Sequence, residues 1–360
     1  MKRDKWISAE ISELLKEKRK TWFDMSRKAR RNRAVRIEYN RLCKKTKKAV
    51  KKAVCDYEKD LASRAKQDPK LVYAYINSKQ NAKEAIRVLE DESGQRVVER
   101  KDNCNLLNKQ FGSVFICEGD GELPEFKSRT NARLHAGNVA AAMTRENVTK
   151  FLTKLCPSKS IGADGVHPSV LRYCADALAP VFVHIFKLSI TEGRVPDRWR
   201  LGNVTSIFKK GSRSCPANNR PVSLTSILCK VMEGLVREIM MQFLLANRLL
   251  APQQHGFVPK KACVTNLLET VDIVTSELAS GRPVDLVYLD FAKAFDTVPH
   301  KRLLLKLAAY GIDDQLCAWV KDFLTNRKQR VVMGEFESEW MDVTSGAPQG
   351  SGLGPLLFLL

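Results

Sequence analysis

The spacing of apolar side chains divides the chain into a helical first part and a more mixed remainder. Residues 8–66 contain neither Gly nor Pro and are rich in Lys, Arg, Ala and Glu, which favour helix. Between Leu42 and Leu61 the apolar side chains recur at steps of three and four residues, so they lie on one stripe of a helix. This pattern predicts a basic helical N-terminal extension over residues 1–90.

The next segment, residues 91–143, lacks such a pattern. Gly and Pro are scattered among its short apolar pieces, and both residue types favour turns. We therefore predict a loosely structured connector that contains one short helix, Asn103–Val114.

From Thr144 onward the pattern becomes regular. Two long apolar stretches predict buried helices over Ser169–Ile190 and Ser223–Leu250. The run Val284–Leu289 is short and apolar and contains β-branched residues, so it predicts a buried strand that ends at Asp290.

Helices are also predicted at His300–Tyr310 and Asp313–Thr325, the first of them ended by Gly311. Two short apolar runs that flank Gly334 predict a β-hairpin formed by Arg330–Met333 and Glu339–Val343.

The last predicted elements are a loop rich in Gly, Pro and Ser, Ser345–Pro355, and an apolar helix, Leu353–Leu360. Four glycines and two prolines fall within residues 346–355. Such a loop allows the backbone to approach a ligand closely. On its own this signal is weak, because many loops are rich in glycine.

Composition adds one strong constraint, the charge. The chain has 360 residues, of which 44% are hydrophobic, and a net charge of +21. This excludes a disordered tail, a collagen-like chain and a small disulfide-stabilised protein. Residues 1–70 hold 24 basic and 10 acidic side chains, so two-thirds of the excess lies in the first fifth of the chain. An excess of this size indicates a polyanionic partner such as nucleic acid or an anionic membrane face.

Two clusters carry much of that charge, KARRNR at residues 28–33 and KKTKKAVKK at residues 44–52. They are typical of an arm that contacts phosphates or of a nuclear import signal. The alternative is a solvated helix whose lysines only keep it soluble. The candidate nucleic-acid-binding residues are Lys28, Arg30, Arg31, Lys44, Lys45, Lys47 and Lys48.

The remaining composition signals concern zinc, redox compartment and membranes. The ten cysteines include no C-x-x-C pair, so no zinc site is predicted. Scattered thiols favour a reducing, intracellular compartment. No apolar run is long enough to span a membrane and the first twenty residues lack the core of a signal peptide. We therefore expect a nuclear and cytoplasmic protein that does not enter a membrane.

A carboxylate at the end of a buried strand is held rigidly and faces a cleft, which suits a ligand of a hard cation. Asp290 has this position in the predicted elements, and Asp296 follows six residues later. We interpret Asp296 as structural.

Taken in order, several segments resemble the reverse transcriptases of non-LTR retrotransposons, the LINE-type and jockey-like elements. The central ones are LDFAKAFDTVPH at 289–300 and GAPQGSGLGPLLF at 346–358. Further segments with the same resemblance lie upstream: DPKLVYAYINSK (68–79), NKQFGSVF (108–115), SIGADGVHP (160–168), WRLGNVTSIFKKGS (199–212), NNRPVSLTS (218–226) and QQHGFVPKKACVTNLL (253–268). The resemblance thus extends over roughly residues 65–360.

The resemblance implies an α+β fold, with the fingers of a right-hand polymerase at residues 144–283 and a partial palm at 284–360. It implies RNA-directed DNA polymerase activity on an RNA template and a DNA primer, with deoxynucleoside triphosphates as substrates. Mg²⁺ or Mn²⁺ is the implied cofactor, because two divalent ions stabilise the attacking and leaving oxygens of phosphoryl transfer.

The resemblance also implies roles for single residues. Asp290 matches the first metal-binding aspartate, and the carbonyl of Phe291 would add an oxygen ligand. Phe295 matches the bulky residue that lies against the sugar. The residues that match contacts to the nucleotide are Lys209, Arg220, Gln349 and Gly350.

The chain also departs from the pattern of this family. Val258 stands where an Arg is usual, and Asn219 replaces a usual Tyr. The aromatic-x-Asp-Asp motif expected after the Gly-rich loop does not occur before Leu360. The sequence therefore leads us to expect a truncated polymerase without its thumb, inactive by itself and of doubtful metal binding. Such a truncation would leave an unpaired sheet edge beside the strand Val284–Leu289 and an uncovered apolar helix at Leu353–Leu360. The alternatives are a nucleic-acid binder without enzymatic activity and an element relic without a role.

Overall fold

The structure is a computed structural model that describes residues 7–28, 33–64, 75, 88–91, 93–119 and 121–360. The chain divides into two compact units, Met1–Ala85 and Ile86–Leu360. Each unit is described by itself. Among the described residues, no helix is both long enough and apolar enough to cross a membrane.

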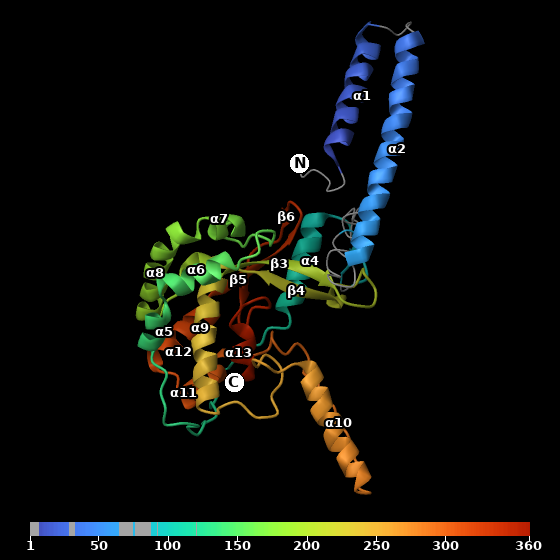
Figure 1. Cartoon of the computed structure of the whole chain (residues 1–360). Helices are drawn as coiled ribbons and strands as arrows, with labels where there is room; N and C mark the ends of the chain where they lie inside the picture. The colour runs from blue at the N-terminus through green and yellow to red at the C-terminus, as the bar shows by residue number, and fades with distance from the viewer. Residues whose placement is uncertain (1–6, 29–32, 65–74, 76–87, 92, 120) are drawn as a thin grey trace. The chain divides into compact units, whose positions relative to one another are not determined.

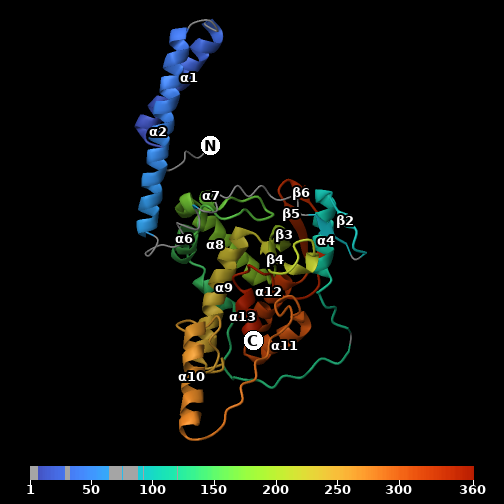
Figure 2. The same cartoon turned by 90° about the vertical axis from the view of Figure 1, so that its right-hand side faces the viewer.

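The first unit is a pair of helices, as the Gly- and Pro-free sequence predicts. Helix α1 covers Ala9–Lys28 and α2 covers Arg33–Arg64, and they run side by side in Figures 1 and 2. Apolar residues of both helices are buried, among them Ile11, Leu14 and Leu42. Because most other positions of α2 are exposed and many are lysines, the pair is a helical hairpin with a narrow apolar contact and a basic surface.

The second unit contains a five-stranded sheet and a group of helices, so the α+β class is confirmed. The sheet has the order β4-β3-β5-β6, with β7 also paired to β5. Its strands are β3 (Leu201–Phe208), β4 (Asn219–Leu224), β5 (Arg327–Met333), β6 (Phe336–Glu337) and β7 (Met341–Val343). A separate short pair is formed by β1 (Leu89–Glu90) and β2 (Arg96–Val97).

One face of the sheet is covered by α4 (Arg100–Gly112), as Figure 1 shows. Strand alternation turns Val204 of β3 and Val331 of β5 towards this helix, where they pack with Leu107 and Phe111. Helix α4 corresponds to the short helix predicted in the connector, although it begins three residues earlier and ends two residues earlier. The prediction of a single helix in residues 91–143 is wrong, because α5 (Ala136–Ala142) also lies there. The opposite sheet face carries more exposed side chains, including Thr205 and Ile207.

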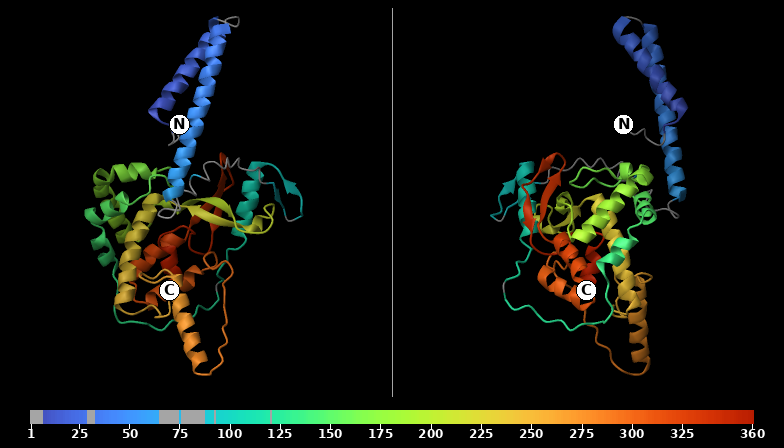
Figure 3. Two further views of the ribbon diagram at one scale, coloured as in Figure 1. Left: turned by 45° about the vertical axis from the view of Figure 1, so that its right-hand side comes forward. Right: turned by 90° about the vertical axis from the view of Figure 1, so that its left-hand side faces the viewer.

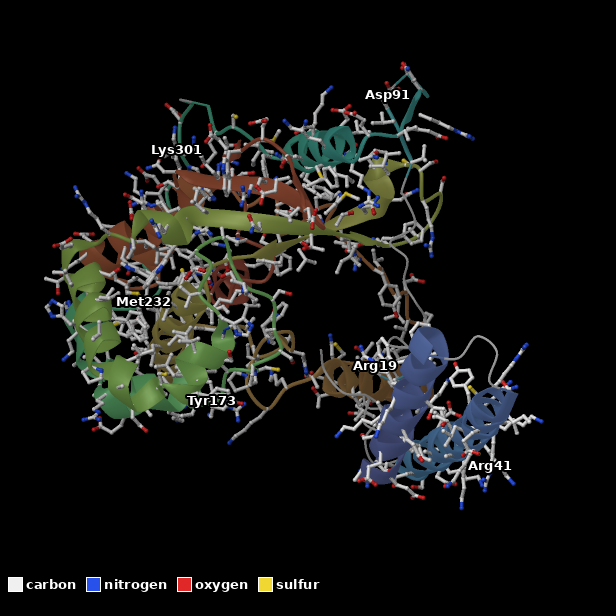
Figure 4. The ribbon with its side chains drawn as sticks, turned by 90° about the horizontal axis from the view of Figure 1, so that it is seen from above. Arg19, Arg41, Asp91, Tyr173, Met232 and Lys301 are labelled. Atoms are coloured by element: carbon white, nitrogen blue, oxygen red, sulfur yellow. The ribbon has the colours of Figure 1, made fainter. Side chains whose placement is uncertain are left out.

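The main core lies among the helices. It is formed by α5 (Ala136–Ala142), α6 (Arg145–Thr153), α7 (Pro168–Tyr173), α8 (Ala175–Glu192), α9 (Ile227–Ala246), α11 (His300–Ala309), α12 (Asp314–Leu324) and α13 (Gly354–Leu359). Figure 4 shows Met232 of α9 inside this group and Tyr173 on its outer side.

Several element predictions need correction in their bounds. The helix predicted over Ser169–Ile190 is two helices, α7 and α8, which meet at Cys174. The helix predicted from Ser223 begins only at Ile227, because Ser223 and Leu224 pair in β4 and Ser226 caps α9 by accepting from the N–H of Cys229. The hairpin around Gly334 is confirmed, since β5 pairs antiparallel with both β6 and β7.

The strand predicted at Val284–Leu289 is wrong. The segment has no strand conformation, and Val287 and Leu289 are 81% and 89% exposed. A strand requires a hydrogen-bonded neighbour, and no described residue pairs with this segment. The expected unpaired sheet edge is therefore not formed there. Residues 284–289 follow α10 (Cys263–Ala279), which has no buried residue and extends away from the other helices of the second unit in Figures 2 and 3.

The predicted helix at Leu353–Leu360 is confirmed as α13, but the expectation that it is uncovered is wrong. Leu353, Leu356, Leu357 and Leu360 are all at most 4% exposed and belong to the main core. The helix is short and apolar, and its leucines are buried within that core.

Candidate nucleotide site

The two central motifs of the sequence, residues 289–300 and the Gly-rich loop 345–355, bond directly to each other. The backbone N–H of Gly346 donates to the carbonyl of Val298 at 2.8 Å, and that of Ala347 donates to the carbonyl of Phe295 at 2.9 Å. The Ser345 hydroxyl donates to the carbonyl of Asp296 at 2.7 Å. Segments that lie far apart in the sequence are thus fixed against each other by their backbones.

His300 adds a further bond to this junction. Its Nε2 lies 2.7 Å from the carbonyl oxygen of Gly346, so Nε2 carries the proton and donates. The side chain is 7% exposed. Burial lowers the pKa of His300, although the carbonyl of Gly346 and the carboxylate of Glu118 oppose that shift.

Gly346 is required by the geometry of this contact. Its φ is +83°, and a Cβ there would lie 2.5 Å from the carbonyl oxygen of Phe295 and 2.7 Å from that of Asp296. A side chain would therefore separate the two motifs. The close approach of the two motifs therefore accounts for a glycine at position 346 of the loop.

Gln349 connects the loop to a buried carboxylate. Its Nε2 lies 2.9 and 3.1 Å from the two carboxylate oxygens of Asp296, and Asp296 is 7% exposed. Burial raises the pKa of Asp296, while the hydrogen bond from Gln349 and the charge of Lys293 lower it. The sequence-based interpretation of Asp296 as structural agrees with this arrangement.

The loop also lies along the free edge of β4. The N–H of Ser223 donates to the carbonyl of Gln349 at 2.8 Å. Gly350 has a φ of +113°, and a Cβ on it would lie 2.8 Å from the carbonyl of Ser223. Because Arg220 belongs to the same strand, the loop and this arginine are parts of one local structure.

Lys209 and Arg220 lie on the same hairpin. Ile207 of β3 pairs with Arg220 of β4, and the N–H of Lys209 donates to the carbonyl of Asn218 at 2.9 Å. Strand alternation places all three on one side of the hairpin, the side away from α4. Both basic residues are exposed. They can therefore reach a phosphate outside the sheet.

Asn219, where the resemblance leads us to expect a Tyr, has a structural role here. It is 4% exposed, and its Nδ2 donates to the carbonyls of Cys215 and Pro216, both at 3.2 Å. Its Oδ1 accepts from the Ser206 hydroxyl at 3.0 Å. The substitution thus closes the turn between β3 and β4.

Phe295 packs in an aromatic group. Its ring centroid lies 4.7 Å from that of Phe358 and 6.2 Å from that of Phe257. Phe257 belongs to the segment 253–268 and Phe358 to the segment 346–358. These two segments therefore meet the segment 289–300 at Phe295. The side chain is partly exposed, which leaves one side of the ring accessible.

Asp290 and Phe291 are not brought into this arrangement by any hydrogen bond or ion pair that the structure gives. Asp290 is exposed and Phe291 is 77% exposed. The rigid strand end expected for a metal ligand is absent because the strand itself is absent. In the described part of the chain, no three His, Cys, Asp or Glu side chains are grouped in a way that could hold a metal ion.

Only some of the candidate nucleic-acid-binding residues of the first unit belong to the described part of the chain. Arg30 and Arg31 lie outside the described residues, and Lys28 ends α1 without a described side chain. The others are exposed on α2: Lys44, Lys45, Lys47 and Lys48.

Comparison with known proteins supplies the family. Residues 207–360 match the reverse transcriptase (RNA-dependent DNA polymerase) family. The chain is 28% identical over 219 residues to the RNA-directed DNA polymerase from mobile element jockey of Drosophila melanogaster, and this match covers 61% of this chain and 24% of that protein.

The chain contains a reverse transcriptase domain of the LINE type. A second relative is the probable RNA-directed DNA polymerase from transposon X-element of Drosophila melanogaster, 27% identical over 214 residues. That match covers 59% of this chain and 24% of the X-element protein. The part of this chain that matches therefore spans about a quarter of the length of these relatives.

The matched region includes most of the site described above. It begins at residue 207, inside β3, and so contains Lys209, Arg220, Phe295, Gln349 and Gly350. Sequence reasoning found these residues by resemblance to the family. It missed the strands β3 and β4 that carry the two basic residues, although alternation of buried Val204 with exposed Thr205 is the signal of such a strand.

Proposed function

We propose that the second unit binds an incoming deoxynucleoside triphosphate as the fingers and part of the palm of an RNA-directed DNA polymerase. The observation that supports this best is the direct bonding of residues 295–300 to the Gly-rich loop, together with the bond from that loop to β4. Three segments that resemble the family thereby meet at one place, next to the hairpin of Lys209 and Arg220.

Each group at this place has a chemical use. The guanidinium of Arg220 presents a fork of donors that suits phosphate oxygens, and Lys209 adds a compact charge. Gly350 allows the backbone to approach a base or sugar without a side chain in the way. The partly exposed ring of Phe295 offers a flat apolar surface to the sugar.

Catalysis by this family uses divalent metal ions. The described residues do not fit that requirement, because no three His, Cys, Asp or Glu side chains among them are grouped in a way that could hold a metal ion. Asp290 and the carbonyl of Phe291 keep their proposed roles as metal ligands on the basis of the resemblance alone.

A binding experiment tests this proposal. The full chain is mixed with an RNA template annealed to a DNA primer with a dideoxy end, and dissociation of the complex is measured with each nucleotide in turn. We expect the complementary nucleotide to slow dissociation, and Arg220→Ala to reduce that effect at least about tenfold, as for a charge-assisted contact. Arg237→Ala, an exposed arginine of α9, is the matched control. Equal effects of all four nucleotides would contradict the proposal.

We also propose that the first unit binds nucleic acid through its basic surface. This second candidate function is favoured by the exposed lysines of α2, which follow one another over residues 44–52. Phosphate contacts of this kind supply affinity without sequence preference. Nuclear and cytoplasmic localisation is part of the same proposal, because the basic clusters are also typical of an import signal.

A further inference from the structure

Glu233 is a buried carboxylate in the middle of α9. The other buried residues of that helix are Ile227, Cys229, Val231, Met232, Gly234, Leu235, Val236, Met240, Met241 and Leu244, none of which is charged. Glu233 itself is 0% exposed. A carboxylate in such surroundings is costly unless hydrogen bonds satisfy it.

All three donors to this carboxylate come from the Gly-rich loop. Oε2 of Glu233 accepts from the N–H of Gly352 at 2.6 Å and from the N–H of Leu353 at 3.1 Å. It also accepts from the hydroxyl of Ser351. Oε1 is buried and has no hydrogen-bond partner among the described residues. One side chain of α9 thus holds three consecutive residues of the loop.

The charge of Glu233 affects its neighbours on the helix and sheet. Burial raises the pKa of the Cys229 thiol, and the charge of Glu233 raises it further. Burial lowers the pKa of Lys230, an effect that Glu233 opposes. Arg327, which is 3% exposed, adds a positive charge to the same region. Glu233 thus influences two residues of its own helix as well as bonding to the loop.

The three anchored residues directly follow the part of the loop assigned to the nucleotide. Gln349 is bonded to β4 through Ser223 and to Asp296 through its side chain. The loop is therefore fixed at one end by residues 295–300 and at the other by Glu233. Residues 349 and 350 lie between these two attachments.

We infer that Glu233 is a positioning residue that holds Gln349 and Gly350 in place for the nucleotide by anchoring residues 351–353. The effect on nucleotide binding rests on the proposed function. The anchoring of residues 351–353 by Glu233 rests on the hydrogen bonds alone. Glu233 lies in the core and would not contact the nucleotide.

Three variants of the full chain test this inference. Glu233→Met removes the acceptor at nearly constant size, whereas Glu233→Gln retains one acceptor oxygen. Glu238→Met is the matched control, because Glu238 is an exposed glutamate of the same helix. A further variant, Ser351→Ala, removes one donor from the loop side and serves if Glu233→Met fails to fold.

The first measurement is hydrogen exchange of the amides of Gly352 and Leu353. We expect Glu233→Met to raise their exchange at least about tenfold, with Ser351→Ala producing a smaller rise, because exchange reports local opening. Glu233→Gln and Glu238→Met should remain within about threefold of the wild-type chain. Unchanged exchange in Glu233→Met, or an equal rise throughout α9 and α12, would overturn the inference, because Glu233 would then have no effect specific to the loop.

The second measurement is the affinity of the complex with primer and template for the complementary nucleotide. We expect Glu233→Met to weaken it at least about fivefold while affinity for primer and template is unchanged, and Glu233→Gln to restore it. Faster loop exchange with unaltered nucleotide affinity would overturn the positioning role. If the wild-type chain binds no nucleotide, the proposed function fails and the exchange data alone decide whether Glu233 is the anchor.

Discussion

The side-chain amide of Gln349 donates to both carboxylate oxygens of Asp296, at 2.9 and 3.1 Å. This contact joins the Gly-rich loop to the segment that carries the predicted catalytic aspartate. Because Asp296 is almost completely buried, the amide is a main source of compensation for its charge.

Gln349→Leu should therefore destabilise the protein at neutral pH. Leaving a buried carboxylate without its donor costs about 1–3 kcal/mol, measurable by urea unfolding. Burial raises the pKa of Asp296 in the folded state above its ordinary value, so its ionisation lowers stability as pH rises through that pKa. The loss in Gln349→Leu should accordingly be smaller at pH 4 than at pH 7.

The same contact can be isolated with a double-mutant cycle. Asp296→Asn removes the charge, so Gln349→Leu should cost less in that background than in the wild-type chain. Strictly additive effects of the two substitutions would show that the side chains do not interact.

Gly346→Ala should destabilise the protein by more than about 2 kcal/mol, because it combines a strained backbone with a steric clash. The added Cβ would meet the carbonyl oxygens of Phe295 and Asp296. Gly137→Ala is the control, since Gly137 lies in α5 with nothing within 4 Å of an added Cβ. It should stabilise the protein by about 0.5–1 kcal/mol. Thermal unfolding should show a lower melting temperature for Gly346→Ala and a higher one for Gly137→Ala.

His300 predicts a dependence of stability on pH. Burial lowers its pKa in the folded state, so the unfolded chain binds more protons at acidic pH. The contribution of His300 is then present above its unfolded pKa of about 6.5 and is lost as pH falls through the lower folded value. Urea midpoints between pH 8 and pH 5 should fall less in His300→Gln than in the wild-type chain. His184→Gln, an exposed histidine of α8, should follow the wild-type curve.

Replacing Lys44, Lys45, Lys47 and Lys48 by Ala should weaken binding to single-stranded RNA equally for all sequences. The slope of log affinity against log salt should become shallower by about 0.7 for each phosphate that is no longer neutralised by a lysine. A charge-matched control replaces four exposed lysines of the second unit: Lys150, Lys154, Lys187 and Lys321. Equal slopes for the wild-type chain and the α2 variant would favour the alternative in which these lysines only keep the helix soluble.

The exposed segment at residues 286–291 should promote self-association. Val287 and Leu289 are more than four-fifths exposed, and a continuous apolar surface of this kind favours aggregation. Val287→Ser with Leu289→Lys should raise the concentration at which light scattering detects aggregates, with no change in the urea midpoint. A lower urea midpoint would indicate that the segment is packed in solution.

Local sequence patterns predicted the elements whose limits are set locally. Helix α11 ends where Gly311 takes a φ of +85°, and α12 begins where Asp313 accepts from the N–H of Leu316 at 2.8 Å. Both the glycine and the aspartate are recognisable in the sequence. The bounds of these two helices were therefore predictable to within a residue or two.

Strands were less predictable because their partners are distant in the chain. Val204 of β3 pairs with Val331 of β5, and nothing near β3 in the sequence indicates that neighbour. The apolar run before Asp290 has the composition of a buried strand but no partner among the described strands. Composition indicates what a segment could form, whereas pairing decides whether it does.

The site likewise combines residues that the sequence identifies with contacts that depend on distant parts of the chain. The resemblance identified Gln349 and Arg220, but the bonds that link the loop to β4 and to Asp296 depend on the folded backbone. Glu233 could not have been singled out, since a glutamate in a helix is normally exposed. Its role becomes visible only from the three donors that converge on it.

The burial of α13 has a consequence for the order in which the protein can fold during synthesis. The core of the second unit begins at Leu134 and includes Leu356, Leu357 and Leu360. While these three leucines are still inside the ribosome, the earlier helices have already emerged and display the apolar surface that α13 will cover. We therefore expect the nascent chain to bind chaperones that recognise exposed apolar surface until α13 has emerged and packed into this core.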